Sequence, residues 1–242
     1  MGPRRFAVCP SLLALRHNQA VEITSYGGTC LRFKGREGTV AADPYAALVG
    51  PTGRGVTADI VTYSHPDRQQ ALGLDKPAAH TRGEGIKLPT SLNSAFLLDS
   101  PGEYEVHGIL INGVRTFRDD QKGAARGANT SFVYELDGLH AIHLGDIGHV
   151  LGEEALGEIG AVDVICVPLG GALSASRAAE LVAQLEAHLI LPMSANGNFG
   201  AEFDRFLHEM GAQKGEPVPR LAVTISSLPQ ETTIVSLEPR GR

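Results

Sequence analysis

Three residues of this sequence carry side chains that commonly bind a catalytic metal. His65 and Asp67 stand two positions apart after an apolar segment, and Asp146 lies between His143 and His149. Imidazole and carboxylate groups are ordinary zinc ligands, and a zinc ion lowers the pKa of a bound water to about 7. Side chains of these types could hold a metal ion that activates a water molecule, and His149 is a further candidate of the same type, although their spacing alone assigns no ligand.

Other common catalytic motifs are absent from the sequence. No GxGxxG follows an apolar strand and no GxxxxGK[ST] is present, so the glycines from Gly50 to Gly55 predict turns rather than a phosphate-binding loop. No GxSxG motif of a serine hydrolase occurs. A metal-independent reaction that uses Tyr63, His65 and Asp67 as acid or base groups stays open, although no further residue supports it.

Composition restricts the partners that the chain can have. Its formal net charge is −6 and its pI is near 5.8, so we expect neither nucleic acid nor an anionic membrane as a partner. No stretch approaches the ~18 apolar residues of a membrane-spanning helix. Cys9, Cys30 and Cys166 are far apart, which predicts reduced thiols and a cytoplasmic location. An unidentified small molecule or protein remains as the expected partner.

Short strands in the first part of the chain are expected to position the candidate ligands. Apolar and β-branched runs bounded by turn residues predict these strands. They are Val21–Ser25, Thr29–Phe33, Thr39–Ala42, Asp59–Tyr63, a strand-rich block from Ala95 through Phe117, Phe132–Leu136 and Leu139–Leu144. Asp137-Gly138 between the last two strands is a strong hairpin signal.

The second part of the chain alternates helices with strands. The expected elements are helices at Glu153–Ile159, Ser176–Glu186 and Glu202–Met210, and strands at Val162–Val167, Leu189–Leu191, Ala222–Ser226 and Thr232–Leu237. This pattern predicts one α/β domain over residues 21–238. We expect residues 1–20 to form a loosely ordered extension and residues 239–242 to form a tail.

Short motifs in a fixed order connect the predicted elements. They are Asp43-Pro44-Tyr45, Thr62-Tyr63-Ser64-His65-Pro66-Asp67-Arg68, Gly102-Glu103-Tyr104, Thr116-Phe117-Arg118-Asp119, Arg126-Gly127-Ala128-Asn129-Thr130, His143-Leu144-Gly145-Asp146-Ile147-Gly148-His149, Val167-Pro168-Leu169-Gly170-Gly171 and Leu191-Pro192-Met193-Ser194. Together they resemble the metallo-β-lactamase superfamily, in particular its single-domain zinc-dependent hydrolases, which are similar to L-ascorbate-6-phosphate lactonase. The resemblance covers about Val21 to Glu238 and implies a four-layer αββα sandwich.

The resemblance also implies a set of metal ligands, most of which are replaced here. The family has His-x-His-x-Asp-His after the fourth strand, a later histidine, a bridging aspartate and a closing histidine. His65, Asp67 and Asp146 remain as a vestigial set, and the replaced positions are Tyr63, Arg68, Arg118 and Ser194. The family's Gly-His step near the first strand reads Gly27-Gly28. Because the remaining donors complete no tetrahedral zinc site, we expect no cofactor.

Arginine at two of the replaced positions suggests how the vestigial carboxylates are neutralised. A guanidinium group has no lone pair for a metal, but it carries a permanent positive charge and donates to carboxylates. We therefore predict that Arg68 and Arg118 occupy the former metal site and pair with Asp67 and Asp146.

Two functions follow from this pattern. The first is a pseudoenzyme of the hydrolase family that binds a small molecule or a protein. The alternative is a zinc-dependent hydrolase of an ester, lactone or phosphoester that uses a reduced site of His65, Asp67 and Asp146, with Asp67 orienting the attacking water. Whether the chain is an enzyme, and its oligomeric state, are not decided by the sequence.

Overall fold

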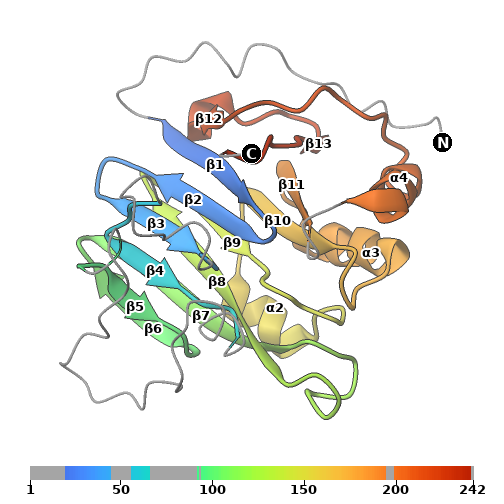
Figure 1. Cartoon of the computed structure of the whole chain (residues 1–242), viewed down its shortest axis with the longest axis horizontal. Coiled ribbons are helices and arrows are strands. Elements are labelled where there is room, and N and C mark those ends of the chain that lie inside the picture. The colour runs from blue at the N-terminus through green and yellow to red at the C-terminus, as the bar shows by residue number, and fades with distance from the viewer. Residues whose placement is uncertain (1–19, 45–55, 66–91, 93, 195–198, 241–242) are drawn as a thin grey trace.

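Two β-sheets face each other in the computed structural model, which describes residues 20–44, 56–65, 92, 94–194 and 199–240. The first sheet has six strands in the order β12-β1-β2-β3-β4-β5 (Figure 1). Their bounds are β1 Val21–Gly27, β2 Cys30–Lys34, β3 Thr39–Ala42, β4 Ile60–Thr62, β5 Phe96–Leu98 and β12 Leu221–Val223. The strands β3, β4 and β5 run parallel to one another, and the remaining pairs are antiparallel.

The second sheet has seven strands in the order β13-β11-β10-β9-β8-β7-β6. Their bounds are β6 Gly102–Val106, β7 Ile109–Phe117, β8 Ala128–Leu136, β9 Leu139–His143, β10 Val164–Leu169, β11 Leu189–Ser194 and β13 Thr233–Ile234. The strands β9, β10, β11 and β13 are parallel, whereas β6 to β9 form an antiparallel meander. The described helices are α2 Glu153–Ile159, α3 Ala175–Leu185 and α4 Gly200–Glu209.

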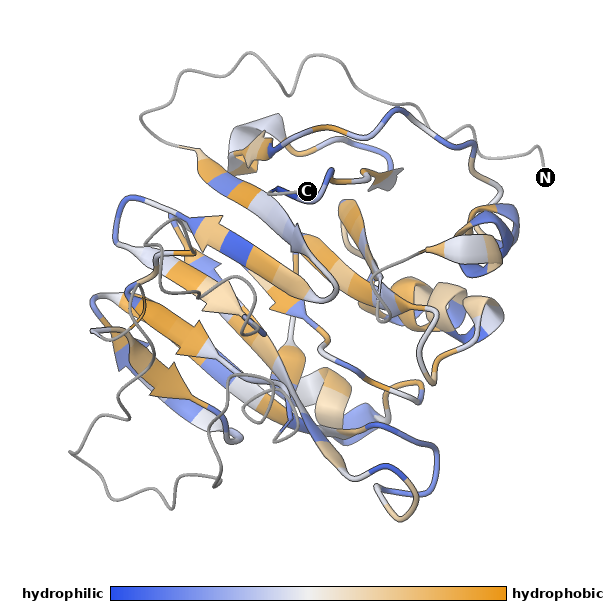
Figure 2. Cartoon of the chain, viewed as in Figure 1, coloured by the Kyte–Doolittle hydropathy of each residue, from blue (hydrophilic) through white to orange (hydrophobic). Residues whose placement is uncertain are grey.

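Three apolar clusters hold these layers together. The largest fills the space between the two sheets and includes Phe33, Phe132 and Tyr134. A second cluster joins the seven-stranded sheet to α2, α3 and α4. Many residues of the strands in both sheets are hydrophobic and are coloured orange in Figure 2. The helices of the described residues thus cover the outer face of the seven-stranded sheet. A third cluster lies on the outer face of the six-stranded sheet and contains Val61 and Tyr63.

The predicted α/β sandwich is confirmed, with local corrections to several elements. The expected closing strand from Thr232 to Leu237 is a strand only over Thr233–Ile234, where it pairs with β11. β8 begins at Ala128 rather than Phe132, because residues 128–131 continue the ladder with β7. The expected strand from Ala222 to Ser226 ends at Val223, and Ile225–Ser227 form a 3₁₀ turn. The Thr224 hydroxyl accepts the N–H of Ser227 and the Ser227 hydroxyl accepts the N–H of Thr224, so this capping box replaces further strand pairing.

Two further observations concern the ends of the chain and the expected lack of a membrane-spanning helix. Residues 1–19 and 241–242 lie outside the described part of the chain, so nearly all of the predicted extension and half of the predicted tail cannot be compared with it. Among the described helices, none has the length and apolar character that a bilayer crossing needs.

One buried hydrogen bond connects the two sheets near the strand ends. The hydroxyls of Thr62 in β4 and Tyr134 in β8 lie 2.7 Å apart, and both residues are buried. Tyr134 also packs on Phe33, with ring centroids 5.1 Å apart. Burial raises the pKa of the Tyr134 phenol, so the group stays protonated.

Tyr134→Phe should lower the free energy of unfolding by about 1–3 kcal/mol, because it leaves the Thr62 hydroxyl buried without its partner. Urea denaturation at pH 7 measures this change. The double variant Thr62→Val with Tyr134→Phe removes both polar groups and should lose less than the sum of the two single variants. Strictly additive losses would show that the two hydroxyls do not stabilise each other.

Candidate functional site

The candidate site lies where the strands of both sheets end on one edge of the sandwich. Parallel pairing places the ends of β3 and β4 side by side, and it places the ends of β9, β10 and β11 side by side in the other sheet. The Ser64 carbonyl, after β4, accepts the N–H of Thr130 in β8 at 2.7 Å. The two groups of strand ends are therefore joined directly by a backbone hydrogen bond.

Asp43 fixes the loop that carries His65. Its backbone has a positive φ of 47°, and its carboxylate accepts the backbone N–H and the hydroxyl of Ser64 at 2.8 and 2.7 Å. The same carboxylate accepts the hydroxyl of Thr29 at 3.0 Å. The buried His143 ring donates from Nε2 to the Thr29 carbonyl at 2.7 Å, so its role is to brace this edge.

Asp146 is the centre of a charged cluster. Its side chain is only 9% exposed, and its Oδ2 accepts Arg118 Nε at 2.9 Å and Arg126 Nη2 at 3.5 Å. Arg118 is nearly buried, at 16% exposure, whereas Arg126 is 43% exposed. The predicted pair of Arg118 with Asp146 is therefore present, and Arg126 joins it.

Asn129 holds the backbone at Asp146 in place. Its side-chain oxygen accepts the Asp146 N–H at 2.9 Å, while its amide donates to the Leu144 carbonyl at 2.9 Å and to Thr116 Oγ1 at 2.7 Å. Gly145 allows the backbone next to Asp146 to lie close to Ser64 and Asn129. A Cβ atom there would lie 2.3 Å from Ser64 Cβ and 2.6 Å from Asn129 Oδ1, and the backbone φ is +67°. Only glycine meets both conditions without rearrangement.

A compact loop after β7 carries the two arginines. The Asp119 carboxylate accepts four backbone N–H groups of this loop, at distances from 2.6 to 3.0 Å. Burial alone would raise the pKa of Asp119, but the four donors together lower it. The Asp119 carboxylate therefore links the backbone N–H of Arg126 to the residue that directly follows Arg118. The sequence motifs contained Asp119, Arg126 and Asn129, but no spacing rule indicated these contacts.

The other predicted positions are only partly brought to this cluster. Asp67 and Arg68 lie outside the described residues. His65 is buried at the end of the β4 loop, with 5% exposure. Within the described part of the chain, the buried hydroxyls of Tyr63 and Ser194 have no hydrogen-bond partner. The Tyr63 ring packs into the apolar cluster on the outer face of the six-stranded sheet.

His149 is engaged through both ring nitrogens. Nε2 accepts the N–H of Phe117 at 3.0 Å, and Nδ1 donates to the Val150 carbonyl at 2.7 Å. The ring also packs on Phe117, with centroids 5.8 Å apart. A metal would have to displace one of these hydrogen bonds, which argues against His149 as a ligand.

The described residues do not fit a zinc site. They contain no group of three histidine, cysteine or acidic side chains in a ligating arrangement. Arg118 has no lone pair to offer, and its guanidinium donates to Oδ2 of Asp146, placing a permanent positive charge beside this carboxylate. Burial, followed by the charges of Asp43 and Cys30, raises the pKa of Tyr63, so its phenol stays protonated.

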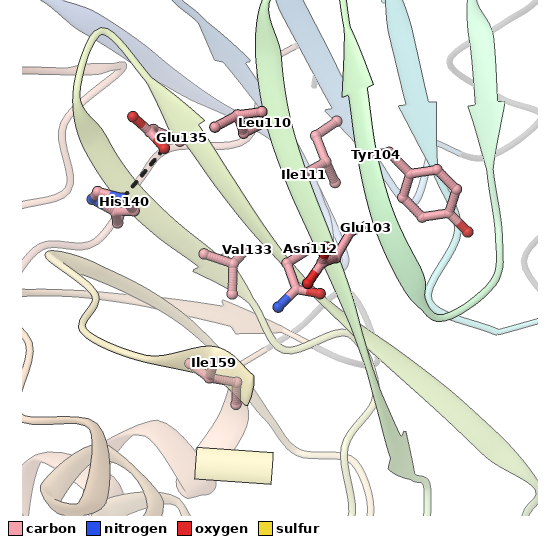
Figure 3. Close-up of a pocket in the computed structure, with 9 residues that line it drawn as sticks. All are labelled: Glu103, Tyr104, Leu110, Ile111, Asn112, Val133, Glu135, His140 and Ile159. Carbon is pink, nitrogen blue, oxygen red and sulfur yellow. Dashed lines mark ion pairs between the residues drawn. The ribbon is translucent and has the colours of Figure 1, made fainter. Parts of the chain in front are cut away.

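A separate pocket of about 280 Å³ lies beside α2, over β6 to β9 (Figure 3). Its polar groups largely pair with one another or with the backbone. His140 Nε2 lies 3.6 Å from Glu135 Oε2, and the Asn112 amide donates to the Glu158 carbonyl at 2.8 Å. None of the predicted site residues lines this pocket.

Known proteins resemble the chain over most of its length. A family model described as a beta-lactamase superfamily domain matches residues 22–194. A UPF0173 metal-dependent hydrolase of Methanoregula boonei is 26% identical over 184 residues, covering 73% of this chain and 82% of the relative.

Solved structures show the same fold. A protein from Thermotoga maritima, assigned to the Zn-dependent hydrolases of the metallo-beta-lactamase superfamily, is 31% identical with a TM-score of 0.64. The match covers 90% of this chain and 98% of that one. A metallo hydrolase from Ignicoccus hospitalis is 18% identical with a TM-score of 0.58, over 85% of this chain and 99% of that one. The predicted family and fold are confirmed, whereas the likeness to L-ascorbate-6-phosphate lactonase stays a prediction.

Arg118→Ala should lower the free energy of unfolding by about 2–4 kcal/mol at pH 7, because it leaves the Asp146 charge nearly buried with only the longer Arg126 contact. Urea midpoints measure the loss. Arg220→Ala is the matched control, since Arg220 contacts Glu22 at the same 2.9 Å but on the surface, where a pair contributes less than ~1 kcal/mol. Equal losses in both variants would place the Arg118 pair among ordinary surface contacts.

Asp119→Asn should destabilise the protein at pH 7 and progressively less toward acid pH. The folded-state pKa of Asp119 is lowered, so the carboxylate stabilises the fold above its unfolded pKa of about 3.9 and loses this effect as pH falls through the folded value. Urea midpoints from pH 7 to pH 3 measure the difference from the parent. Asp120→Asn, at an exposed pair with Arg177, should show little change, and a deficit for Asp119→Asn that grows in acid would contradict this account.

Proposed function

The chain belongs to the beta-lactamase superfamily, and from this premise we propose that it is a member in which arginine has replaced the metal centre. On this proposal the protein binds a small molecule or a protein partner and does not hydrolyse a substrate with zinc. The observation that carries the proposal is the Arg118 contact with Asp146 at 2.9 Å.

The charge balance at Asp146 supports the proposal. A nearly buried carboxylate needs a positive partner, and a metal ion or a guanidinium can supply one. Arg118 and Arg126 both reach Oδ2 of Asp146, so the described structure already neutralises this charge. A metal would have to displace a permanently charged side chain and would meet its electrostatic repulsion.

The residues at two other family histidine positions also support the proposal. Ser194 presents a neutral hydroxyl, which is a weak zinc ligand, and Tyr63 keeps its proton because burial raises its pKa. The same shift makes Tyr63 a poor general base, which weakens the metal-independent reaction through Tyr63, His65 and Asp67.

A second candidate function is favoured by the names of the relatives. Several of them are described as metal-dependent hydrolases, and this chain keeps His65, Asp67 and Asp146. In such an enzyme zinc would be the cofactor, and Asp67 would orient the attacking water at an ester, lactone or phosphoester. Asp146 would first have to be released by Arg118.

Three further properties remain proposals. The single domain over residues 21–238 rests on the continuity of the predicted elements. A cytoplasmic location rests on the separated cysteines, of which Cys166 is a buried free thiol. The absence of a nucleic acid or membrane partner rests on the net charge of −6.

Protein purified without chelators should contain far less than one equivalent of zinc by mass spectrometry. Added zinc should leave the melting temperature unchanged, whereas a ligand at about a hundred times its Kd adds about 2.7 kcal/mol of stability. The matched comparison is the variant Tyr63→His, Arg68→His, Arg118→His and Ser194→His, which restores histidine at four of the positions where the family pattern has it. Two tightly bound zinc ions in the parent protein would contradict the proposal.

Activity separates the two candidate functions. The proposal predicts no hydrolysis of lactone, phosphodiester or β-lactam substrates that is lost both on chelation and on Asp67→Asn. A rate that is lost under both conditions would establish the metal-dependent hydrolase instead.

A further inference from the structure

The seven-stranded sheet leaves one row of side chains uncovered by helices. Residues directly opposite each other in neighbouring strands share a face of a sheet. The row consists of Glu105 in β6, Leu110 in β7, Glu135 in β8 and His140 in β9. Leu110 is 48% exposed and is one of three exposed large apolar side chains in the described part of the chain. An exposed leucine therefore lies between two glutamates on the sheet surface.

The neighbouring row shows which face of the sheet this is. Glu103 lies opposite Asn112, and Asn112 lies opposite Val133. Val133 belongs to the apolar cluster that joins the sheet to α2, and the Asn112 amide donates to the carbonyl of Glu158 in α2 at 2.8 Å. Both rows therefore lie on the outer face beside the end of α2, and most of their residues line the pocket of about 280 Å³ (Figure 3).

This surface is acidic. Glu103, Glu105 and Glu135 carry its negative charges, and α2 adds three further glutamates. Neither the two rows nor α2 contains a lysine or an arginine. His140 is the one basic side chain, and its Nε2 lies 3.6 Å from Glu135 Oε2. Glu103 and Glu105 are exposed and form no ion pair within the described part of the chain, so a positively charged partner with an apolar part would complement the surface.

The acidic surface borders an edge of the sheet. β6 pairs with β7 over five residues, and no described strand lies on its other side. Every second residue of an edge strand directs its N–H and C=O groups away from the neighbouring strand, so a further strand can pair with them. Tyr104 and Val106 point to the opposite face of β6 and pack, partly buried, against the core between the sheets. An added strand would thus meet carboxylates on one face and apolar side chains on the other.

A second copy of the chain does not suit this edge. β6 beside β6 would place glutamates opposite glutamates, and like charges directly opposite each other destabilise a sheet. A strand with lysine or arginine at alternate positions would instead place positive charges opposite Glu103 and Glu105. The stems of these basic side chains are apolar and would cover Leu110, while the residues between them would face Tyr104 and Val106.

We propose that the outer face of β6 and β7 binds an extended segment of a partner protein in which basic and apolar residues alternate, and that this segment adds to β6 as a further strand. None of the residues involved belongs to the Asp146 cluster, so the inference goes beyond the proposed function and holds with or without a metal at Asp146. The partner is identified by its chemistry, with positive charges on one face of an extended chain and apolar side chains on the other.

The test uses the peptide Lys-Val-Arg-Val-Arg-Val-Lys, blocked at both ends, and isothermal titration calorimetry with the full chain. One peptide should bind per chain, and binding should weaken as salt rises, because salt screens exposed charges. The control peptide has the same composition with its basic residues consecutive. It should bind about threefold or more weakly, since only part of its charge can then lie on the face of Glu103 and Glu105.

Variants of the protein locate the binding surface. Glu105→Lys should weaken binding of the alternating peptide about three- to tenfold, the range of one cross-strand charge pair changed from attraction to repulsion. Leu110→Ser should weaken it about four- to tenfold, because the peptide no longer buries the exposed half of this leucine. The matched controls are Glu180→Lys, at an exposed glutamate of α3, and Ile225→Ser, at a side chain that is 50% exposed outside this surface. Both controls should bind as the parent does, and all four variants should keep its melting temperature, since the changed side chains are exposed.

Amide hydrogen exchange tests the added strand. Exchange in β6 should slow when the peptide is bound, whereas exchange in β13, the opposite edge of the same sheet, should not change. Absence of saturable binding, binding without protection of β6, equal binding of the two peptides, or equal affinities of the surface variants and their controls would overturn the proposal.

The chain's own N-terminal segment is the other possible occupant. Residues 1–19 contain three arginines and no acidic residue. In the full chain, the variant Arg4→Glu, Arg5→Glu and Arg16→Glu should bind the alternating peptide as the parent does. Tighter binding by this variant would show that residues 1–19 compete for the surface, and it would overturn the assignment to a partner protein.

Discussion

The carboxylate of Asp146 is nearly buried and fixed in place, so the surrounding structure must supply a positive charge. The backbone N–H of Asp146 is held by the Asn129 side chain. The preceding residue, Gly145, can lie against Ser64 in the loop after β4 because glycine has no Cβ atom. Two guanidinium groups supply the charge, one nearly buried and one half exposed. The loop tied by Asp119 carries these groups to the site. Charge compensation at one carboxylate therefore depends on residues from β8, from the turn after β9 and from the loop after β7.

The same constraint connects the fold to the proposed function. The sandwich brings the ends of β4, β9 and β11 to one edge, where the family pattern implies the metal ligands. In this chain the edge has become two different environments. Around Asp146 it is an ion-pair cluster, and beside Ser194 it is an apolar pocket with one buried hydroxyl. Neither environment of the described residues is a cage of imidazoles.

Much of the fold could be predicted from the sequence because period-two strands, turn glycines and amphipathic helices are local signals. Arg118 could be paired with Asp146 because the family pattern places both at the metal. The contacts of Arg126, Asn129 and Asp119 could not be predicted. They depend on the conformation of the loop after β7, which no periodic pattern in the sequence indicates. The start of β8 at Ala128 was missed for a related reason. Ala128, Asn129, Thr130 and Ser131 are small or polar, and only the ladder with β7 makes them a strand.

The central claim is that arginine has taken the place of the metal at Asp146. Anomalous diffraction above the zinc absorption edge, from crystals soaked in zinc, tests this claim at the site itself. The account predicts no anomalous peak beside Asp146 and an intact contact between Arg118 Nε and Asp146 Oδ2. A peak within bonding distance of Asp146 and His65, with Arg118 displaced, would contradict it.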